Sequence, residues 1–280
     1  TNNAHGLSFW TSATGAAPTE RLTISSAGAV SIPGTFTVGS LDIGHGANGD
    51  DSNTAVGTDA MDGALAGALE NTAIGYNALT AVLTATADHN TAVGSNSSAA
   101  LTSGKRNTAL GRSSLVGGTD CNYNTAIGYG TVGAAGVGHD NTGVGYKALN
   151  AFTGSDATAV GSGAAALAVG SLHTTAVGMN ALAACTGNRN TAVGRSCFEA
   201  LTGGELNVGL GSYTGNQTTG SRNTFLGTWA GFYATTTDDC IAIGYSALKA
   251  ADSAGDNSDN ATGNHNIAIG NYSLDAITTG

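Results

Sequence analysis

A five-residue motif, Asn-Thr-Ala-Val/Ile-Gly with variants, recurs along most of the chain and limits the folds that are open to it. Thirteen copies occur, from Asn53–Gly57 to Asn266–Gly270. Nine of the twelve spacings between successive motif glycines are 16 or 17 residues. Self-similarity at one short period predicts a repeat architecture in which each unit packs mainly on its two neighbours.

The length of the repeat selects the kind of unit. A pair of packed helices needs more than about thirty residues, whereas two short strands and two turns fit into one coil of a β-solenoid. Within the motif, Thr and Val or Ile alternate with Ala and Gly, which is the period of a strand with one branched and one small face. We therefore predict an all-β parallel β-roll or β-solenoid of about thirteen coils over residues 40–280. At the strand spacing of ~4.8 Å, the rod would be roughly 60 Å long.

Glycine closes all thirteen copies, although the other motif positions vary. Such invariance within one chain indicates a backbone requirement, either a positive φ or a neighbouring backbone that leaves no room for a Cβ. The predicted structural glycines are Gly57, Gly75, Gly94, Gly111, Gly128, Gly145, Gly161, Gly178, Gly194, Gly211, Gly227, Gly244 and Gly270.

Two further columns appear when the copies are aligned on this glycine. Four residues after it, nine copies carry Met61, Leu79, Leu115, Val132, Leu149, Leu182, Phe198, Leu248 and Leu274. We interpret these residues as the apolar column of a second strand or of a corner. The motif asparagines form the other column, which we expect to hydrogen-bond along the stack and to satisfy backbone groups at a corner.

Residues 1–39 do not repeat, and we predict that they form an N-terminal β-strand cap or connector. Leu7–Trp10, Glu20–Ile24 and Ala29–Ile32 have the pattern of short strands joined by turns. Such a segment would cover the edge of the stack, which would otherwise pair with other chains. The extra residues 251–263 are predicted to be a loop outside the coil wall. The chain starts at Thr1 and ends just after a motif, so we expect a piece of a longer protein.

Composition excludes several classes of partner. The formal net charge is −10, and an acidic surface repels phosphate, so nucleic acid is not an expected partner. No run of 18 apolar residues predicts a membrane-inserted segment. The four cysteines, Cys121, Cys185, Cys197 and Cys240, lack metal-binding spacing and are expected to be buried and reduced. A disulfide between Cys185 and Cys197 is the alternative.

No arrangement of residues predicts catalysis, and we expect the chain not to be an enzyme. None of the six histidines lies in a metal-binding or metalloprotease pattern. No cofactor is expected. Calcium is the one metal considered, at Asp50-Asp51, at Asp238-Asp239 or in the loop at 252–259, where plain solvated turns are the alternative.

Aromatic residues are scarce, so one cluster of them stands out. Phe225, Trp229, Phe232 and Tyr233 fall within nine residues. Exposed aromatic rings can stack on sugars, which makes these four residues a candidate receptor contact. The alternatives are that they pack together inside a widened coil or at an interface between chains.

The repeats resemble the head of trimeric autotransporter adhesins, the YadA-like head, whose repeat is close to Asn-Ser-Val-Ala-Ile-Gly. Asn71-Thr72-Ala73-Ile74-Gly75 and its relatives carry this resemblance over roughly residues 40–280. It implies a left-handed parallel β-roll in which three chains pack side by side. The N-terminal segment Thr19–Gly28, with Leu7–Trp10, is similar instead to a unit of bacteriophage tail fibre proteins, which often continue into Asn-Thr-Ala-Val-Gly repeats.

Together, these observations predict a homotrimeric fibre segment of a phage virion that is structural and adhesive. Its expected partners are copies of itself, other virion proteins and a host cell-surface glycan or protein, and its expected location is the virion, outside the cell. A bacterial surface adhesin head is one alternative. A fibre-borne polysaccharide depolymerase is another. An obligate trimer is predicted, because one coil buries too few large side chains to be stable alone. The small Ala and Gly face of the motif is expected to receive the neighbouring chain.

Overall fold

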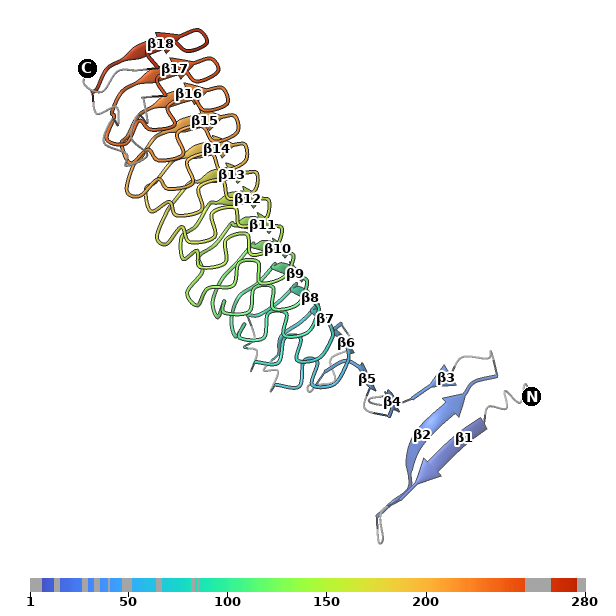
Figure 1. The fold of residues 1–280 in the computed structure, drawn as a ribbon. Helices are drawn as coiled ribbons and strands as arrows, with labels where there is room; N and C mark the ends of the chain where they lie inside the picture. The colour runs from blue at the N-terminus through green and yellow to red at the C-terminus, as the bar shows by residue number, and fades with distance from the viewer. Residues whose placement is uncertain are drawn as a thin grey trace.

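The computed structural model describes residues 7–12, 16–26, 30–32, 36–39, 41–46, 52–63, 67–81, 84, 86–249 and 263–275. Every regular element within these residues is a β-strand. Three N-terminal strands, β1 (Leu7–Thr11), β2 (Thr19–Ile24) and β3 (Val30–Ser31), form a small antiparallel sheet. They correspond to the three strand-like segments expected in the sequence, and Figure 1 shows them at one end of a long rod.

The rod itself is built on one sheet of fifteen strands in chain order (Figure 1). It starts with β4 (Phe36–Val38) and β5 (Leu41–Gly44), which pair antiparallel with each other. Strand β5 also pairs antiparallel with the first motif strand, so this hairpin covers that edge of the stack. The motif strands are β6 (Thr54–Val56), β7 (Thr72–Ile74), β8 (Thr91–Val93), β9 (Thr108–Leu110), β10 (Thr125–Ile127), β11 (Thr142–Val144), β12 (Thr158–Val160), β13 (Thr175–Val177), β14 (Thr191–Val193), β15 (Val208–Leu210), β16 (Thr224–Leu226), β17 (Ile241–Ile243) and β18 (Ile267–Ile269).

The motif strands pair in parallel, with each motif position opposite the same position of the next coil. Thr125 lies opposite Thr142 and Ile127 opposite Val144, for example. This confirms the predicted all-β parallel solenoid with one coil per repeat. Register is kept because a slip of one residue would exchange the inner and outer faces of a strand.

The prediction of two strands per coil is wrong for the described coils, each of which contributes one three-residue strand. The rest of the coil turns, because three of its positions adopt a left-handed backbone. In the coil of β11 these are Asp140 (φ 59°), Lys147 (φ 53°) and Leu149 (φ 54°). Left-handed residues reverse the chain direction and leave no run long enough for a second strand.

The apolar column therefore lies at a corner. Its members are completely buried, except for Leu274 in the last described coil, which is 38% exposed. Bulky residues such as Val132 (φ 51°) and Phe198 (φ 51°) hold a conformation that costs roughly 1–2 kcal/mol per residue. Burying such a side chain contributes about 1.5–3 kcal/mol, which offsets this strain.

The small face of the motif strands, which was expected to face a neighbouring chain, faces the interior of the coil instead. The middle residue, usually Ala, faces the interior, and Ala126 is completely buried. The flanking Thr125 and Ile127 are only half-buried. The prediction that the small face receives another chain is therefore wrong, because the interior is narrow and Ala fills it against the corner column of the same chain. The face available to a partner carries Thr, Val, Ile and Leu.

The asparagine column forms the predicted ladder. The backbone nitrogen of Asn124 donates to Oδ1 of Asn107 over 3.0 Å, and Nδ2 of Asn107 donates to the carbonyl oxygen of Cys121 over 2.8 Å. The ladder is interrupted where Ala157, Thr174 and Cys240 replace Asn. The hydroxyl of Thr174 is buried and has no hydrogen-bond partner.

The motif glycines meet both backbone requirements that the sequence suggested. Gly145 has a φ of +131°, and a Cβ at this position would lie 2.7 Å from the carbonyl oxygen of Gly161 in the next coil. Gly270 has a φ of +116°, but no atom of the described residues lies within 4 Å of the position that a Cβ would take.

The cysteines are buried free thiols, as expected, and no disulfide joins Cys185 to Cys197. Burial raises the pKa of Cys121 to about 11 and that of Cys197 to about 12. The predicted loop at 251–263 falls almost entirely outside the described residues.

Candidate ligand-binding site

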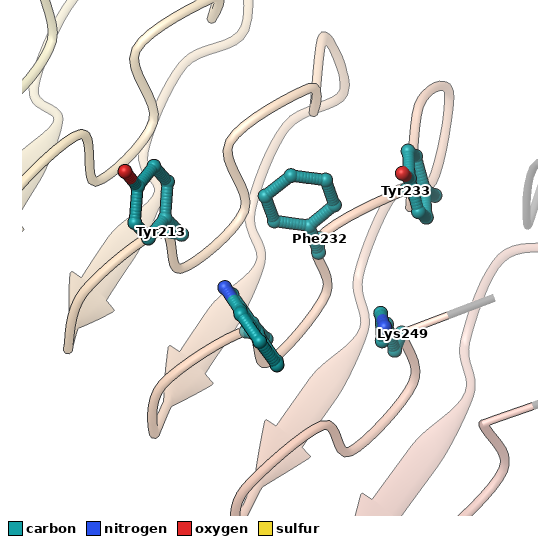
Figure 2. A pocket seen from close by; sticks show the side chains of 5 residues that line it. Tyr213, Phe232, Tyr233 and Lys249 are labelled. Carbon is teal, nitrogen blue, oxygen red and sulfur yellow. The ribbon is translucent and has the colours of Figure 1, made fainter. Parts of the chain in front are cut away.

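An aromatic pocket opens on the wall of the rod near its C-terminal end. Its lining comes from three neighbouring coils and consists of Tyr213, Trp229, Phe232, Tyr233 and Lys249. Figure 2 shows Tyr213, Phe232, Tyr233 and Lys249 around it. Its volume is about 330 Å³, at the lower end of the range of small-molecule sites. We call this site the aromatic pocket.

The repeat geometry explains how these side chains meet. Tyr213 and Trp229 each lie two residues after a motif glycine, at the first left-handed position after the motif strand (φ 57° and 61°). Phe232 and Lys249 each lie five residues after one, just beyond the corner. Because equivalent positions stack at the strand spacing of ~4.8 Å, side chains from successive coils stand side by side.

The rings are close enough to hold one another in place. The centroids of Tyr213 and Phe232 are 6.2 Å apart, and those of Phe232 and Tyr233 are 4.6 Å apart with the rings nearly perpendicular. The ring centroid of Trp229 is 5.5 Å from that of Tyr245, which does not line the pocket. All four pocket aromatics are half-buried, so each keeps part of its surface accessible. Edge-to-face and tilted contacts of this kind are the favoured aromatic geometries.

Two cations lie against the aromatic side chains. The ammonium of Lys249 is 5.0 Å from the ring of Trp229, and the guanidinium of Arg195 is 5.1 Å from the ring of Tyr213. The chain has only nine Lys and Arg residues and a net charge of −10. The aromatic pocket is therefore locally basic on an acidic rod.

Three of the four aromatic residues predicted from the sequence, Trp229, Phe232 and Tyr233, line this pocket. The fourth, Phe225, was predicted wrongly as a receptor contact, because it is completely buried. It occupies the middle position of β16, which faces the interior, and the corner positions beside it are Gly215 and Gly231. A Cβ at either glycine would collide with a phenylalanine ring, so these two glycines make room for Phe225 and Phe198.

Tyr213 and Lys249 were missed as members of the pocket. They are distant from the predicted cluster in sequence, but counting from each motif glycine places Tyr213 in the column of Trp229 and Lys249 in the column of Phe232. The position of a residue relative to its motif glycine could therefore have identified both residues, whereas the clustering of aromatic residues along the chain could not.

A second aromatic strip lies on earlier coils. Tyr129 and Tyr146 stack with their ring centroids 5.6 Å apart and their planes inclined by 12°. Arg112 lies over Tyr129, and Lys147 lies over Tyr146. Both tyrosines are exposed on the surface, at 43% and 54%, and do not line the aromatic pocket.

The carboxylates considered for calcium are arranged differently. Asp239 accepts two hydrogen bonds from Arg222, at 2.6 and 2.8 Å, and this contact holds the pKa of Asp239 below its usual value. The side chain of Asp238 accepts a hydrogen bond from the backbone nitrogen of Ser221. Among the described residues, no group of three His, Cys, Asp or Glu side chains is placed to hold a metal. Asp50-Asp51 and the loop at 252–259 lie outside the described residues.

Over the residues that the structure describes, no helix could cross a membrane. Comparison of the chain with models of known protein families, with curated proteins and with solved structures finds no match in any of the three.

Proposed function

We propose that this chain is a structural and adhesive fibre segment of a phage virion, a tail fibre in the simplest case, built from three copies side by side. The observation that carries the proposal is the outer face of the motif strands. Large apolar side chains stand exposed along it at intervals over the whole stack, at Ile74, Leu110, Val160, Leu210, Ile243 and Ile269.

An apolar strip of this length favours a protein partner. Contiguous exposed apolar surface on a soluble protein usually marks an interface. A second copy carries the same strip with the same coil spacing, so parallel copies match coil by coil, and soluble assemblies of identical chains are usually closed and symmetric. The number three comes from the resemblance of the repeats to the trimeric adhesin head.

The straight stack suits a spacer, because each coil contacts mainly its two neighbours and the length grows with the repeat number. The resemblance of residues 7–28 to tail fibre proteins supports the virion as the setting. In this arrangement the aromatic pocket would be the contact to a glycan or protein of the host surface, and the chain ends would join other virion proteins.

Sedimentation equilibrium tests the assembly. We expect a species of three times the chain mass of 27.3 kDa. Leu210→Lys, in the exposed strip, should dissociate it, whereas Leu167→Lys should not, because Leu167 is 60% exposed but lies outside the motif strands. A stable folded monomer of the unmodified chain would contradict the proposal.

The proposed location in a phage virion needs a separate experiment. An antibody against the chain should label the fibres of purified phage particles in electron micrographs. Labelling of the surface of intact bacteria instead would replace the virion by a bacterial adhesin head.

A further inference from the structure

We infer that the aromatic pocket binds a sugar ring that carries a carboxylate, such as a uronic acid within a surface polysaccharide. This inference rests on the proposed adhesive function and names the ligand class of the pocket. It is built from the accessible rings of Tyr213, Trp229, Phe232 and Tyr233 and from the position of Lys249.

The rings favour a sugar. The face of an aromatic ring is negative, so it attracts the positively polarised C–H groups on one face of a pyranose. Phe232 and Tyr233 are nearly perpendicular (84°), so their rings form two walls of the pocket that differ in orientation. The hydroxyl of Tyr213 adds a group that can both donate and accept hydrogen bonds, which suits a ligand covered with hydroxyls.

Lys249 favours a carboxylate on that sugar. Lys249 is half-buried, and its ammonium lies over the Trp229 ring, 5.0 Å from the ring centroid, at the pocket that both residues line. A hydrogen bond between an ammonium and a carboxylate is charge-assisted and is stronger than one between neutral groups. Arg195 does not line the pocket, but its guanidinium lies over the ring of Tyr213, 5.1 Å from the centroid, and adds a second positive charge nearby.

The charges around the pocket also limit which ligands it can bind. Glu199 lies two coils before Phe232 in the same column, and its carboxylate accepts hydrogen bonds from Asn180 and Asn216 (3.3 and 3.1 Å). This negative group and the overall charge of −10 disfavour ligands with many negative charges, such as nucleic acid. One carboxylate next to Lys249 is compatible with this field, because charges more than about 8 Å away are largely screened at physiological salt.

Tryptophan fluorescence can test the inference in the assembled full chain. The chain has two tryptophans, so Trp10→Phe leaves Trp229 as the reporter. We expect D-glucuronate to change the Trp229 emission saturably. D-glucose should bind about ten- to a hundredfold more weakly, since a hydrogen bond to a charged group contributes a factor of that size. Lys249→Gln should remove the preference for glucuronate while weak binding of glucose remains.

Several results would overturn the inference. They are the absence of a saturable change with glucuronate, equal affinity for glucose, an unchanged preference in Lys249→Gln, or tighter binding of adenosine monophosphate. The matched control is Tyr146→Ala with Lys147→Gln, which removes an aromatic and cationic pair outside the pocket and should leave glucuronate binding unchanged.

Sedimentation of Trp229→Ala distinguishes a failure of the sugar site from a failure of the proposed fibre assembly. If Trp229→Ala lowers the mass of the assembly, the pocket is a contact between copies, and the sugar site is wrong while the fibre assembly stands. If the assembly persists and glucuronate still does not bind to the unmodified chain, only the sugar site fails. A monomeric unmodified chain removes the proposed fibre instead.

Discussion

Both nitrogens of Asn107 donate to the side-chain oxygen of Asn90 in the preceding coil, the backbone nitrogen over 3.0 Å and Nδ2 over 3.0 Å. Asn107 in turn holds the next coil, because its own Oδ1 accepts from the backbone nitrogen of Asn124. These side chains are buried, so water cannot reach their polar groups, and the hydrogen bonds of the ladder satisfy them instead. The ladder therefore links neighbouring coils from within the wall of the rod.

Replacing Asn107 by Ala should destabilise the rod. The change leaves the carbonyl oxygen of Cys121 and the backbone nitrogen of Asn124 buried without this partner, at a cost of about 2–4 kcal/mol per chain. Urea unfolding followed by circular dichroism measures the loss. Asn150→Ala, which removes one bond from a half-buried amide to the carbonyl oxygen of Gly130, is the control and should cost less than about 1 kcal/mol. Equal losses would show that the ladder has no special role.

Thr174→Asn should repair an existing gap in the ladder. The Thr174 hydroxyl is buried without a partner, whereas the side chain of Asn190 at the equivalent place donates to the carbonyl oxygen of Gly204 and accepts from the backbone nitrogen of Asn207. We expect a gain of about 0.5–1.5 kcal/mol per chain, the usual net value of one hydrogen bond. The melting temperature should rise relative to the parent. Thr175→Asn, on the neighbouring half-buried position, should not raise it.

Gly145→Val should strongly destabilise the assembly, and Tyr146→Val should have a mild effect. The positive φ and the nearby carbonyl oxygen of Gly161 together predict a cost of about 2–6 kcal/mol per chain. Thermal melts compare the two variants. Gly270→Val separates the causes, because it shares the positive φ but has no atom of the described residues near its Cβ position, and it should cost less. Comparable melting temperatures for Gly145→Val and Tyr146→Val would remove the glycine argument.

Deleting one whole repeat, Asn124–Asp140, should preserve folding. Strand β9 would then pair with β11 in the same register, Asn141 would take the place of Asn124 in the ladder, and the rod would shorten by one step of ~4.8 Å. Deleting only 124–131 should prevent folding, because the inner and outer faces no longer match. Circular dichroism and small-angle X-ray scattering report both outcomes. Equal tolerance of the two deletions would contradict the register.

The buried thiols should make stability fall at high pH. The pKa of Cys121 is raised to about 11 and that of Cys197 to about 12, so the unfolded chain releases these protons first. Their effect on the free energy of unfolding is constant below the ordinary thiol pKa of about 8.5. It becomes destabilising as the pH rises from there towards 11. Cys121→Ala with Cys197→Ala should flatten this dependence between pH 8 and pH 10.5, as measured by urea unfolding, and an unchanged slope would assign it to other groups.

Much of the fold could be predicted from periodicity, because a repeat must bury the same positions in every coil. The thirteen motif copies, their strands, the glycine requirement and the asparagine ladder all follow from columns that are visible in the sequence. The prediction of a second strand in each coil was wrong, because left-handed corners at residues such as Leu149 and Phe198 have no sequence signature. Both residue types ordinarily avoid that conformation.

Sequence alone determined the repeat, the register and the presence of aromatic residues near the C-terminal end. Only the tertiary structure decided which strand face is buried and which aromatics share a pocket. The physical reason is the width of the coil. The narrow interior admits Ala and one corner side chain, and it accommodates Phe225 only where Gly215 and Gly231 leave space. The residues Tyr213 and Lys249 line the same pocket because the coils stack, although they are 36 positions apart in the chain.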